Sequence, residues 1–263
     1  MAFPYKHVCL VGATSGIGRA MADRLIAEGV KVTAVGRRQD RLNEFVKEHG
    51  KTKASSLAFD ISDLDQIPKF AEEVMKAHSD IDCIFLNAGI QHRYDFSSPS
   101  SLNLPRFMAE MTTNFNSFVA FTHAFLPYLL NQSTNTGIIY TGTHLGIVPA
   151  STMPAYSASK AALDSFILCV REQLRDTRVK ITNLSPPPVQ TELHDAEMGQ
   201  EAGRAIGMPV TAFADAAYKE LTGGNENIII GSVAASSMEQ FMEIVNLRRE
   251  AFDRLAMLLR GMK

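Results

Sequence analysis

A glycine-rich turn near the start of the 263-residue chain limits the possible folds more than any other stretch. The turn has the sequence GATSGIG at residues 12–18, follows an apolar run at residues 8–11 and precedes apolar residues at helical spacing. A buried strand, a glycine turn and a helix form the unit in which a helix N-terminus binds a phosphate. A tight turn without a ligand is the alternative, but the flanking strand and helix favour a dinucleotide site.

The same alternation of apolar runs and helical patterns continues through most of the chain. It predicts a doubly wound α/β fold, in which helices cover both faces of a parallel sheet of about seven strands. Ligands of such sheets bind at the edge where the carboxyl ends of the strands meet. That edge would bring together Gly12, Gly36, Asp60, Asn87, Thr143 and Pro186. The predicted strands are residues 8–11, 30–35, 55–59, 81–86, 137–142, 179–184 and 228–231.

Length and composition fit one soluble domain over residues 1–263. The net charge of −2 gives no reason to expect nucleic acid or an anionic membrane as a partner. The most apolar stretch, residues 115–130, is too short and too polar to span a bilayer. The histidines lack metal-ligand spacing, so we expect no metal site.

The cysteines give an expectation about the cellular compartment. Cys9, Cys83 and Cys169 are scattered through apolar segments and form no C-x-x-C pair. We therefore expect all three to be reduced core residues of an intracellular protein. No signal segment opens the chain, so we expect a cytoplasmic location.

Tyr156 and Lys160 are four residues apart in a segment, residues 155–174, with apolar side chains at helical spacing. Positions i and i+4 share one helix face, so the phenol and the ammonium should point the same way. Because a nearby cation favours the phenolate, we expect Lys160 to lower the pKa of Tyr156 and make it a usable acid or base. A surface Tyr and Lys one turn apart is the alternative, since the pattern is short.

Arg37 and Arg38 follow the second predicted strand, where a dinucleotide fold meets the adenosine ribose. A carboxylate at this point would bind the 2′-hydroxyl of NAD, whereas guanidinium groups bind the 2′-phosphate of NADP. The strand tip carries no carboxylate, which favours NADP(H) over NAD(H). A solvated start to the helix predicted over residues 41–49 is the alternative.

The ordered motifs between residues 5 and 232 resemble the short-chain dehydrogenase/reductase family. Each motif is weak alone, but their order and intervals match those of the family. The similarity is carried by residues 12–18, Asp60, Asn87-Ala88-Gly89, Asn114 in a helix predicted over residues 105–130, residues 156–160 (YSASK), Pro186 and Thr191. The resemblance implies a Rossmann-type sheet of seven parallel strands and a nicotinamide cofactor.

The resemblance also implies roles for the matched residues. Tyr156 would donate the proton when a carbonyl is reduced, Lys160 would hold the nicotinamide ribose, and Asn114 would support a water chain that resupplies protons. The implied catalytic residues are Asn114, Thr143, Tyr156 and Lys160. The implied cofactor-binding residues are Gly12, Thr14, Ser15, Gly16, Ile17, Gly18, Arg37, Arg38, Asp60, Ile61, Asn87, Ala88, Gly89, Tyr156, Lys160, Pro186, Val189 and Thr191.

Three positions depart from the family pattern. Thr143 replaces the usual serine; its hydroxyl can still bind the substrate oxygen, but its methyl narrows the pocket, so we expect an altered substrate shape preference. Pro186-Pro187-Pro188 replaces Pro-Gly and would stiffen the start of a predicted mobile lid at residues 192–208. Val11 replaces a threonine, which is a mild structural change.

The substrate pocket is the least predictable part of the site, because loops build it. Its candidate walls are apolar: Phe96, Leu145, Met153 and Leu193. Three polar residues near the motifs are candidates for substrate contacts, although a structural or solvated role is more common for such residues: His92, Arg93 and His144.

The segment at residues 236–263 extends beyond the last predicted strand as a helix with an apolar stripe. The stripe consists of Met238, Phe241, Met242, Val245, Phe252, Leu255 and Leu259. Packing on its own domain is the simplest interpretation. Our hypothesis is that it packs against a second subunit, in a homodimer or homotetramer, or over the pocket. A membrane-surface helix is disfavoured.

These observations predict an NADPH-dependent enzyme that reduces the carbonyl of a small apolar ketone or aldehyde and oxidises the alcohol in reverse. Two alternatives remain open. The same cleft would also suit imine reduction or a non-redox reaction, or the chain is a cofactor-binding sensor without turnover. The residues that favour the enzyme are Tyr156, Lys160 and Asn114. The sensor remains an alternative because Thr143 replaces the usual catalytic serine.

Overall fold

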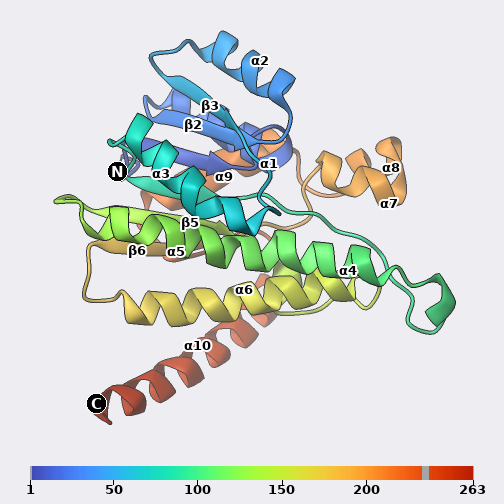
Figure 1. The fold of residues 1–263 in the computed structure, drawn as a ribbon. Helices are drawn as coiled ribbons and strands as arrows, with labels where there is room; N and C mark the ends of the chain where they lie inside the picture. Colours follow the sequence, from blue (N-terminus) through green and yellow to red (C-terminus); the bar gives the residue numbers. More distant parts are fainter. Residues whose placement is uncertain (1, 233–236, 263) are drawn as a thin grey trace.

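A computed structural model describes residues 2–232 and 237–262 of the chain. Within these residues the centre is a seven-stranded sheet with the strand order β3-β2-β1-β4-β5-β6-β7 (Figure 1). Every neighbouring pair of strands runs parallel. The strands are β1 (His7–Val11), β2 (Lys31–Gly36), β3 (Ala54–Ala58), β4 (Cys83–Leu86), β5 (Thr136–Thr141), β6 (Val179–Ser185) and β7 (Asn227–Ile229). The predicted doubly wound fold is confirmed.

The order of strands reverses beside β1. The chain builds outward from β1 through β2 to β3, then returns to pair β4 with the other side of β1 and continues to β7. The crevice between the carboxyl ends of β1 and β4 is therefore the switch point at which open parallel sheets bind ligands.

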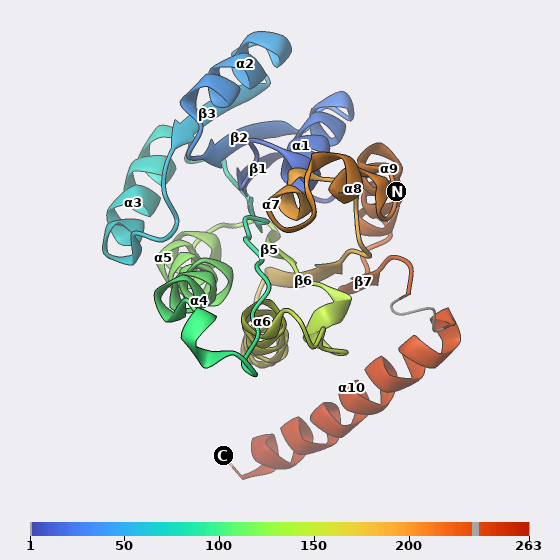
Figure 2. The same ribbon diagram turned by 90° about the vertical axis from the view of Figure 1, so that its right-hand side faces the viewer.

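Two layers of helices cover the sheet, as Figure 2 shows. One layer consists of α1 (Gly16–Ala27), α2 (Gln39–His49) and α9 (Val210–Thr222), and the other of α3 (Ile67–Ala77), α5 (Ser117–Leu130) and α6 (Pro154–Gln173). Alternate residues of a strand face opposite layers. In β1, Val8 and Leu10 join the core beside α1, whereas Cys9 and Val11 join the core beside α5. Burial on both faces explains why the central strands β1 and β4 are almost continuously apolar.

The helix expected over residues 105–130 is not continuous. It is divided into α4 (Leu104–Met111), a π-helical segment (Thr112–Asn116) and α5. A π-helical turn contains more residues per turn than an α-helix, so it changes the direction of the side chains that follow. Asn114 lies within this segment and is fully buried. Apolar spacing in the sequence does not reveal such a local insertion.

The polar segment after β6, predicted as a mobile lid at residues 192–208, contains short helices. They are η5 (Glu192–His194), α7 (Asp195–Met198) and α8 (Gln200–Ala205). Its mobility stays a prediction. The other single turns of 3-10 helix are η1 (Leu64–Gln66), η2 (Pro99–Ser101) and η4 (His144–Gly146).

The last helix, α10 (Met238–Gly261), stands apart from the two helical layers in Figure 2. A capping box between Ser237 and Gln240 starts it. Ion pairs connect it to α6: Arg248 contacts Asp164, and Arg260 lies 2.6 Å from a carboxylate oxygen of Glu172. The predicted extra C-terminal helix is therefore confirmed, and residues 236 and 263 of that prediction lie outside the described residues.

The apolar stripe expected on this helix is only partly buried. Phe241 is buried, and its ring centroid lies 4.8 Å from that of His144. Met238, Leu255 and Leu259 are exposed, contrary to packing of the whole stripe on the domain. Further along the helix, Val245 and Phe252 are half-buried and Ala256 is buried, so one face of α10 still faces the body while Leu255 and Leu259 point to solvent.

One cysteine differs from expectation. Cys9 and Cys83 are buried, but Cys169 is exposed on α6. The buried stripe of that helix includes Leu163, Ile167 and Val170, and position 169 falls outside its spacing. Among the described helices, none is long and apolar enough to cross a lipid bilayer.

Candidate active site

The glycine-rich turn folds tightly against the neighbouring strand ends. The backbone nitrogens of Gly12 and Ala13 both donate to the carbonyl of Val35, at 2.8 and 3.0 Å. Gly12 has φ of +89°, and a Cβ there would lie 2.6 Å from the backbone nitrogen of Ala88. A Cβ on Gly18 would lie 2.0 Å from the carbonyl oxygen of Gly12. These contacts require glycine at both positions.

The turn leaves the start of α1 open to a ligand. Ser15 is the N-cap residue, and its side chain makes no capping hydrogen bond. The first N–H groups of a helix have no intrahelical partner, and the helix dipole favours an anion beside them. The turn therefore fits the pyrophosphate of a dinucleotide.

Asn87 connects the turn to the next two strands at the switch point. Its Nδ2 donates to the carbonyl of Gly12 at 3.2 Å, and its Oδ1 accepts from Thr141 Oγ1 at 3.0 Å. Gly89 follows, and a Cβ on it would lie 3.4 Å from Asn114 Oδ1 and 4.0 Å from Lys160 Nζ. The ends of β1, β4 and β5 thus form one continuous wall.

A cleft of about 570 Å³ runs along this edge of the sheet. Every residue predicted to bind the cofactor lines this cleft except Gly18. Gly18 instead allows the turn to pack closely against Gly12. Thr143, Tyr156 and Lys160 also line the cleft, so the structure brings these predicted catalytic residues together with the predicted cofactor site. Asn114 is not among the lining residues.

Tyr156 and Lys160 lie in the first turns of α6 and are both buried. The ammonium of Lys160 donates to the carbonyl of Thr141 at 2.8 Å and lies 5.9 Å from the centroid of the Tyr156 ring. The Thr143 side chain hydrogen-bonds to Tyr156. The phenol therefore has a hydroxyl partner on one side and a cation within one helical turn.

The expectation that the pKa of Tyr156 is lowered is wrong, because the net shift is upward. Burial raises the pKa of Tyr156 to about 12, although the hydrogen bond from Thr143 opposes the shift, and the charge of Glu110 adds to it. Burial also lowers the pKa of Lys160 to about 8. Desolvation disfavours the charged form of both groups, so each is pushed toward neutrality.

Asn114 fixes the backbone beside the cleft. Its Oδ1 accepts from the nitrogen of Ile90 at 2.9 Å, and its Nδ2 donates to the carbonyl of Ile90 at 2.8 Å and to Ser159 Oγ at 3.2 Å. These bonds hold the loop after β4 against α6. The water chain implied for Asn114 stays a prediction.

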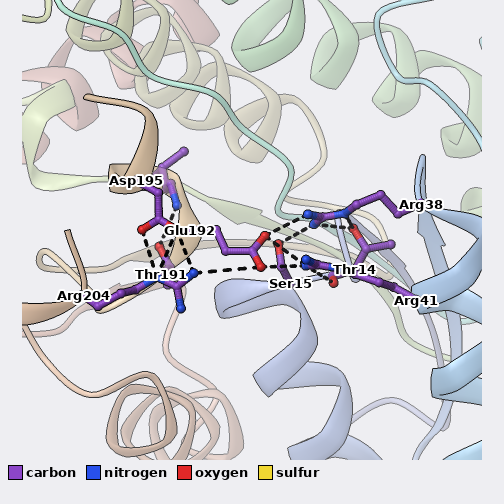
Figure 3. A network of polar contacts seen from close by, with 9 residues as sticks. Thr14, Ser15, Arg38, Arg41, Thr191, Glu192, Asp195 and Arg204 are labelled. Atoms are coloured by element: carbon purple, nitrogen blue, oxygen red, sulfur yellow. Dashed lines mark hydrogen bonds and ion pairs between the residues drawn. The ribbon is translucent and has the colours of Figure 1, made fainter. Parts of the chain in front are cut away.

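Arg38, rather than Arg37, faces the glycine turn (Figure 3). Arg38 Nη2 donates to Thr14 Oγ1 at 2.8 Å and to Ser15 Oγ at 2.6 Å. Arg37 is 68% exposed, and its Nη1 lies 3.9 Å from a carboxylate oxygen of Asp60. Adjacent residues of an extended chain point to opposite sides, so only one of the two arginines turns inward.

Sequence reasoning missed two residues that complete this cluster, Glu192 and Arg41. Glu192 accepts from Arg38 Nη1 at 2.8 Å and from Arg41 Nη1 at 2.7 Å. Partial burial raises its pKa, but the hydrogen bonds from both arginines outweigh burial and lower the pKa to about 2. The only sequence signal was an acidic residue directly after Thr191, and this does not indicate that its partners are arginines more than 150 positions away.

The substrate end of the cleft is mainly apolar, with some differences from expectation. Leu145, Met153 and Leu193 line it, whereas Phe96 does not and is 60% exposed. Met198 and Ile206, from the segment predicted as a lid, complete the wall.

The polar candidates divide into different roles. His92 lines the cleft, and its Nδ1 bonds to a carboxylate oxygen of the buried Glu110 at 2.8 Å. Arg93 is exposed and lies outside the cleft lining. His144, the residue after Thr143, lines the cleft and is buried against Phe241, so it connects the cleft to α10.

Comparison with known proteins identifies the family. Residues 6–202 match the short chain dehydrogenase family. The uncharacterized oxidoreductase DltE of Bacillus subtilis (strain 168) is 33% identical over 187 residues, which cover 71% of this chain and 73% of the relative. The chain belongs to the short chain dehydrogenase family. It is therefore a member of a family of oxidoreductases, as the ordered motifs predicted.

Solved structures of other dehydrogenases share this fold. A family member from Burkholderia phymatum in complex with NAD has a TM-score of 0.80 at 21% identity, over 97% of this chain and 96% of that chain. The closed form of serine dehydrogenase complexed with NADP+ has a TM-score of 0.78 at 25% identity, over 88% of this chain and 97% of that chain. Both nicotinamide cofactors thus occur among the similar structures.

Proposed function

We propose that the protein is an NADP(H)-dependent oxidoreductase that reduces the carbonyl of a small, largely apolar ketone or aldehyde and oxidises the alcohol in reverse. The observation that carries the proposal is one cleft with Thr143, Tyr156 and Lys160 along it and the Arg38 guanidinium at the glycine turn. Such a cleft would place a proton donor beside the carbonyl oxygen of the substrate and a cation beside a 2′-phosphate.

The residues at the strand ends would hold the cofactor. The turn at residues 12–18 and the start of α1 would bind the pyrophosphate, and Asp60 and Ile61 would contact the adenine. Arg38, with Thr14, would bind the 2′-phosphate, because a guanidinium makes forked, charge-assisted bonds to phosphate. Further along the cleft, the residues assigned to the nicotinamide end are Lys160, Pro186, Val189 and Thr191.

Tyr156 would act as the general acid. With a pKa of about 12, it keeps its proton at neutral pH and can give it to the substrate oxygen as hydride reaches the carbonyl carbon. Thr143 would hold that oxygen beside the phenol, since its hydroxyl already contacts Tyr156. The bound nicotinamide supplies or accepts the hydride, and the protein supplies position and electrostatics.

The substrate proposal rests on the walls at the far end of the cleft. Leu145, Met153 and Leu193 favour an apolar body next to the reacting carbonyl. His92, held by Glu110, adds one polar contact at the rim.

NADPH oxidation at 340 nm tests the proposal against a panel of aldehydes, ketones, diketones and cyclic imines, with NADH in parallel. We expect turnover with carbonyls that have apolar substituents, faster with NADPH than with NADH. Turnover with imines alone would mean that the substrate is an imine and not a ketone or aldehyde. Tight binding of NADPH without turnover over the whole panel would favour a sensor and overturn the enzyme proposal.

We also propose that the protein is a homo-oligomer that pairs through α10. Ile244, Leu247, Leu255, Leu258 and Met262 form a second apolar stripe at helical spacing, and each is between 48% and 82% exposed. A stripe of this kind on a helix that stands off the body favours a partner.

A second copy of the same helix fits the stripe. Glu250 and Arg254 lie four residues apart near its middle, both exposed. In an antiparallel two-fold pairing whose axis passes midway between these positions, the glutamate of each copy would face the arginine of the other. The remainder of the chain would be one domain to which α10 is appended.

The cysteines support a reducing compartment. All three described cysteines are free thiols. Free thiols persist in the cytosol, so we propose a cytoplasmic location. Cell fractionation with an antibody to the full chain tests this, and recovery in an oxidising compartment would contradict it.

A further inference from the structure

The guanidinium proposed to bind a 2′-phosphate is already paired with a carboxylate of the protein itself (Figure 3). We call Thr14, Ser15, Arg38 and Arg41 the anion cradle. Glu192 lies within it, at 2.8 Å from Arg38 Nη1 and at 2.7 and 3.0 Å from Arg41 Nη1. The hydroxyls of Thr14 and Ser15 hold the other side of the Arg38 guanidinium.

Glu192 is also the first residue of the segment predicted to form a lid. Behind it, Arg204 makes two parallel bonds to Asp195, of 2.9 and 2.8 Å, which tie α8 to α7. Arg204 Nη2 also lies 4.0 Å from Glu192 Oε1, which connects η5 to the same unit. The contact from Glu192 to the anion cradle joins this unit to the glycine turn. Glu192 also lines a second hollow of about 640 Å³ beside the cofactor cleft, as do Thr14 and Ser15.

A phosphate and this carboxylate need the same donors. Two anions in one cradle repel each other, and a phosphate monoester carries about −1.5 to −2 charge and three acceptor oxygens, against one charge and two oxygens for a carboxylate. The side chain of Glu192 is 33% exposed, so it can turn into water when it is displaced.

From this geometry we propose that Glu192 is an internal competitor for the 2′-phosphate and couples the lid to the identity of the cofactor. NADP(H) displaces its carboxylate from Arg38 and Arg41 and frees the first turn of the lid. NAD(H) has no 2′-phosphate and leaves the contact intact. The proposal rests on the proposed dinucleotide function of the cleft. NADP(H) shifts the lid because it binds the state without the Glu192 contact more tightly than the state with it.

The test compares cofactor binding by the wild type, Glu192→Gln and Glu197→Gln, measured by isothermal titration with NADPH and with NADH. Glu197 is a matched control, because it lies on the same segment and pairs with Arg106 at 2.7 Å, away from the anion cradle. We expect Glu192→Gln to bind NADPH roughly tenfold more tightly, since one charge-assisted competitor is weakened. Binding of NADH should be unchanged, and Glu197→Gln should match the wild type with both cofactors.

Hydrogen exchange of residues 192–205 gives a second readout that needs no turnover. In the wild type, saturating NADPH should speed exchange at the start of the segment, and NADH should not. In Glu192→Gln, exchange there should be fast before any cofactor is added.

Three results would overturn the proposal. They are unchanged NADPH affinity in Glu192→Gln, an equal change in Glu197→Gln, and weaker NADH binding in Glu192→Gln, which would mean that Glu192 binds the ribose hydroxyls. A wild type that prefers NADH and becomes NADPH-preferring through Glu192→Gln would overturn the cofactor preference proposed above but uphold the competition.

Discussion

Lys160 donates its ammonium to the backbone carbonyl of Thr141 at 2.8 Å and is buried in the cofactor cleft. The carbonyl partner is neutral, so no negative charge offsets the loss of solvation of the buried ammonium. Burial therefore lowers the pKa of Lys160 to about 8. This lysine therefore changes charge close to physiological pH.

The pH dependence of the reduction should follow Lys160. Its ammonium is present below pH 8 and is lost above it, whereas Tyr156, with a pKa of about 12, keeps its proton throughout. We expect kcat/KM for NADPH to be flat below about pH 8 and to fall as the pH rises through that value. Lysine side-chain NMR of the ligand-free protein should show one signal titrating near pH 8. If that signal persists in Lys160→Met, the assignment is wrong.

Tyr156→Phe should remove the proton donor and leave the cofactor site intact. General acid catalysis typically contributes about 10²–10⁴-fold, so we expect kcat to fall by that order while the Kd for NADPH stays unchanged. Tyr128→Phe on α5 is the control, since its ring lies 38% exposed and outside the cleft lining. Near-normal turnover by Tyr156→Phe would contradict the proposed mechanism.

Arg38→Ala and Arg37→Ala should separate the two neighbouring arginines. Arg38 contacts Thr14 and Ser15, whereas Arg37 is largely exposed. Removing a forked guanidinium contact to phosphate should weaken NADPH binding by roughly tenfold or more and leave NADH binding nearly unchanged. Arg37→Ala should have a small effect on both cofactors. Fluorescence titration with each cofactor measures this, and equal losses in both variants would remove the 2′-phosphate argument for Arg38.

Much of the fold and part of the site could be predicted from the sequence. The glycine turn, the strand ends and the spacing of Tyr156 and Lys160 are local patterns, so their positions followed from chain order and the topology of parallel sheets. Which arginine turns inward was not predictable, because Arg37 and Arg38 are chemically identical and differ only in direction. The π-helical turn around Asn114 is a local insertion that leaves the apolar pattern almost unchanged.

The electrostatics of the site were predicted least well. Proximity suggested that Lys160 would lower the pKa of Tyr156, but burial decides the sign, and burial is a property of the whole fold. Glu192 pairs with Arg38 and Arg41 across more than 150 residues of sequence, so no local motif could identify it.

Gly18→Ala should show how closely the glycine turn is packed. The added Cβ would lie 2.0 Å from the carbonyl oxygen of Gly12, so the turn must shift away from α1. We expect a loss of stability of about 1–3 kcal/mol from overpacking, together with weaker binding of both cofactors. Gly261→Ala in α10 is the control, since nothing lies within 4 Å of an added Cβ there. Thermal unfolding and cofactor titration measure both effects, and an unchanged melting temperature in Gly18→Ala would contradict the packing.

Leu255→Glu should dissociate the oligomer proposed to form through α10. Leu255 is 56% exposed at the centre of the second apolar stripe of α10, so a charge there costs little in the single chain but is buried without a partner in the pair. We expect sedimentation velocity to show a smaller species with an unchanged melting temperature of the monomer. Glu243→Gln, outside the apolar stripe on the same helix, should leave the association state unchanged. If the wild type already sediments as a monomer at high concentration, α10 does not pair, and its stripe must be explained by another partner.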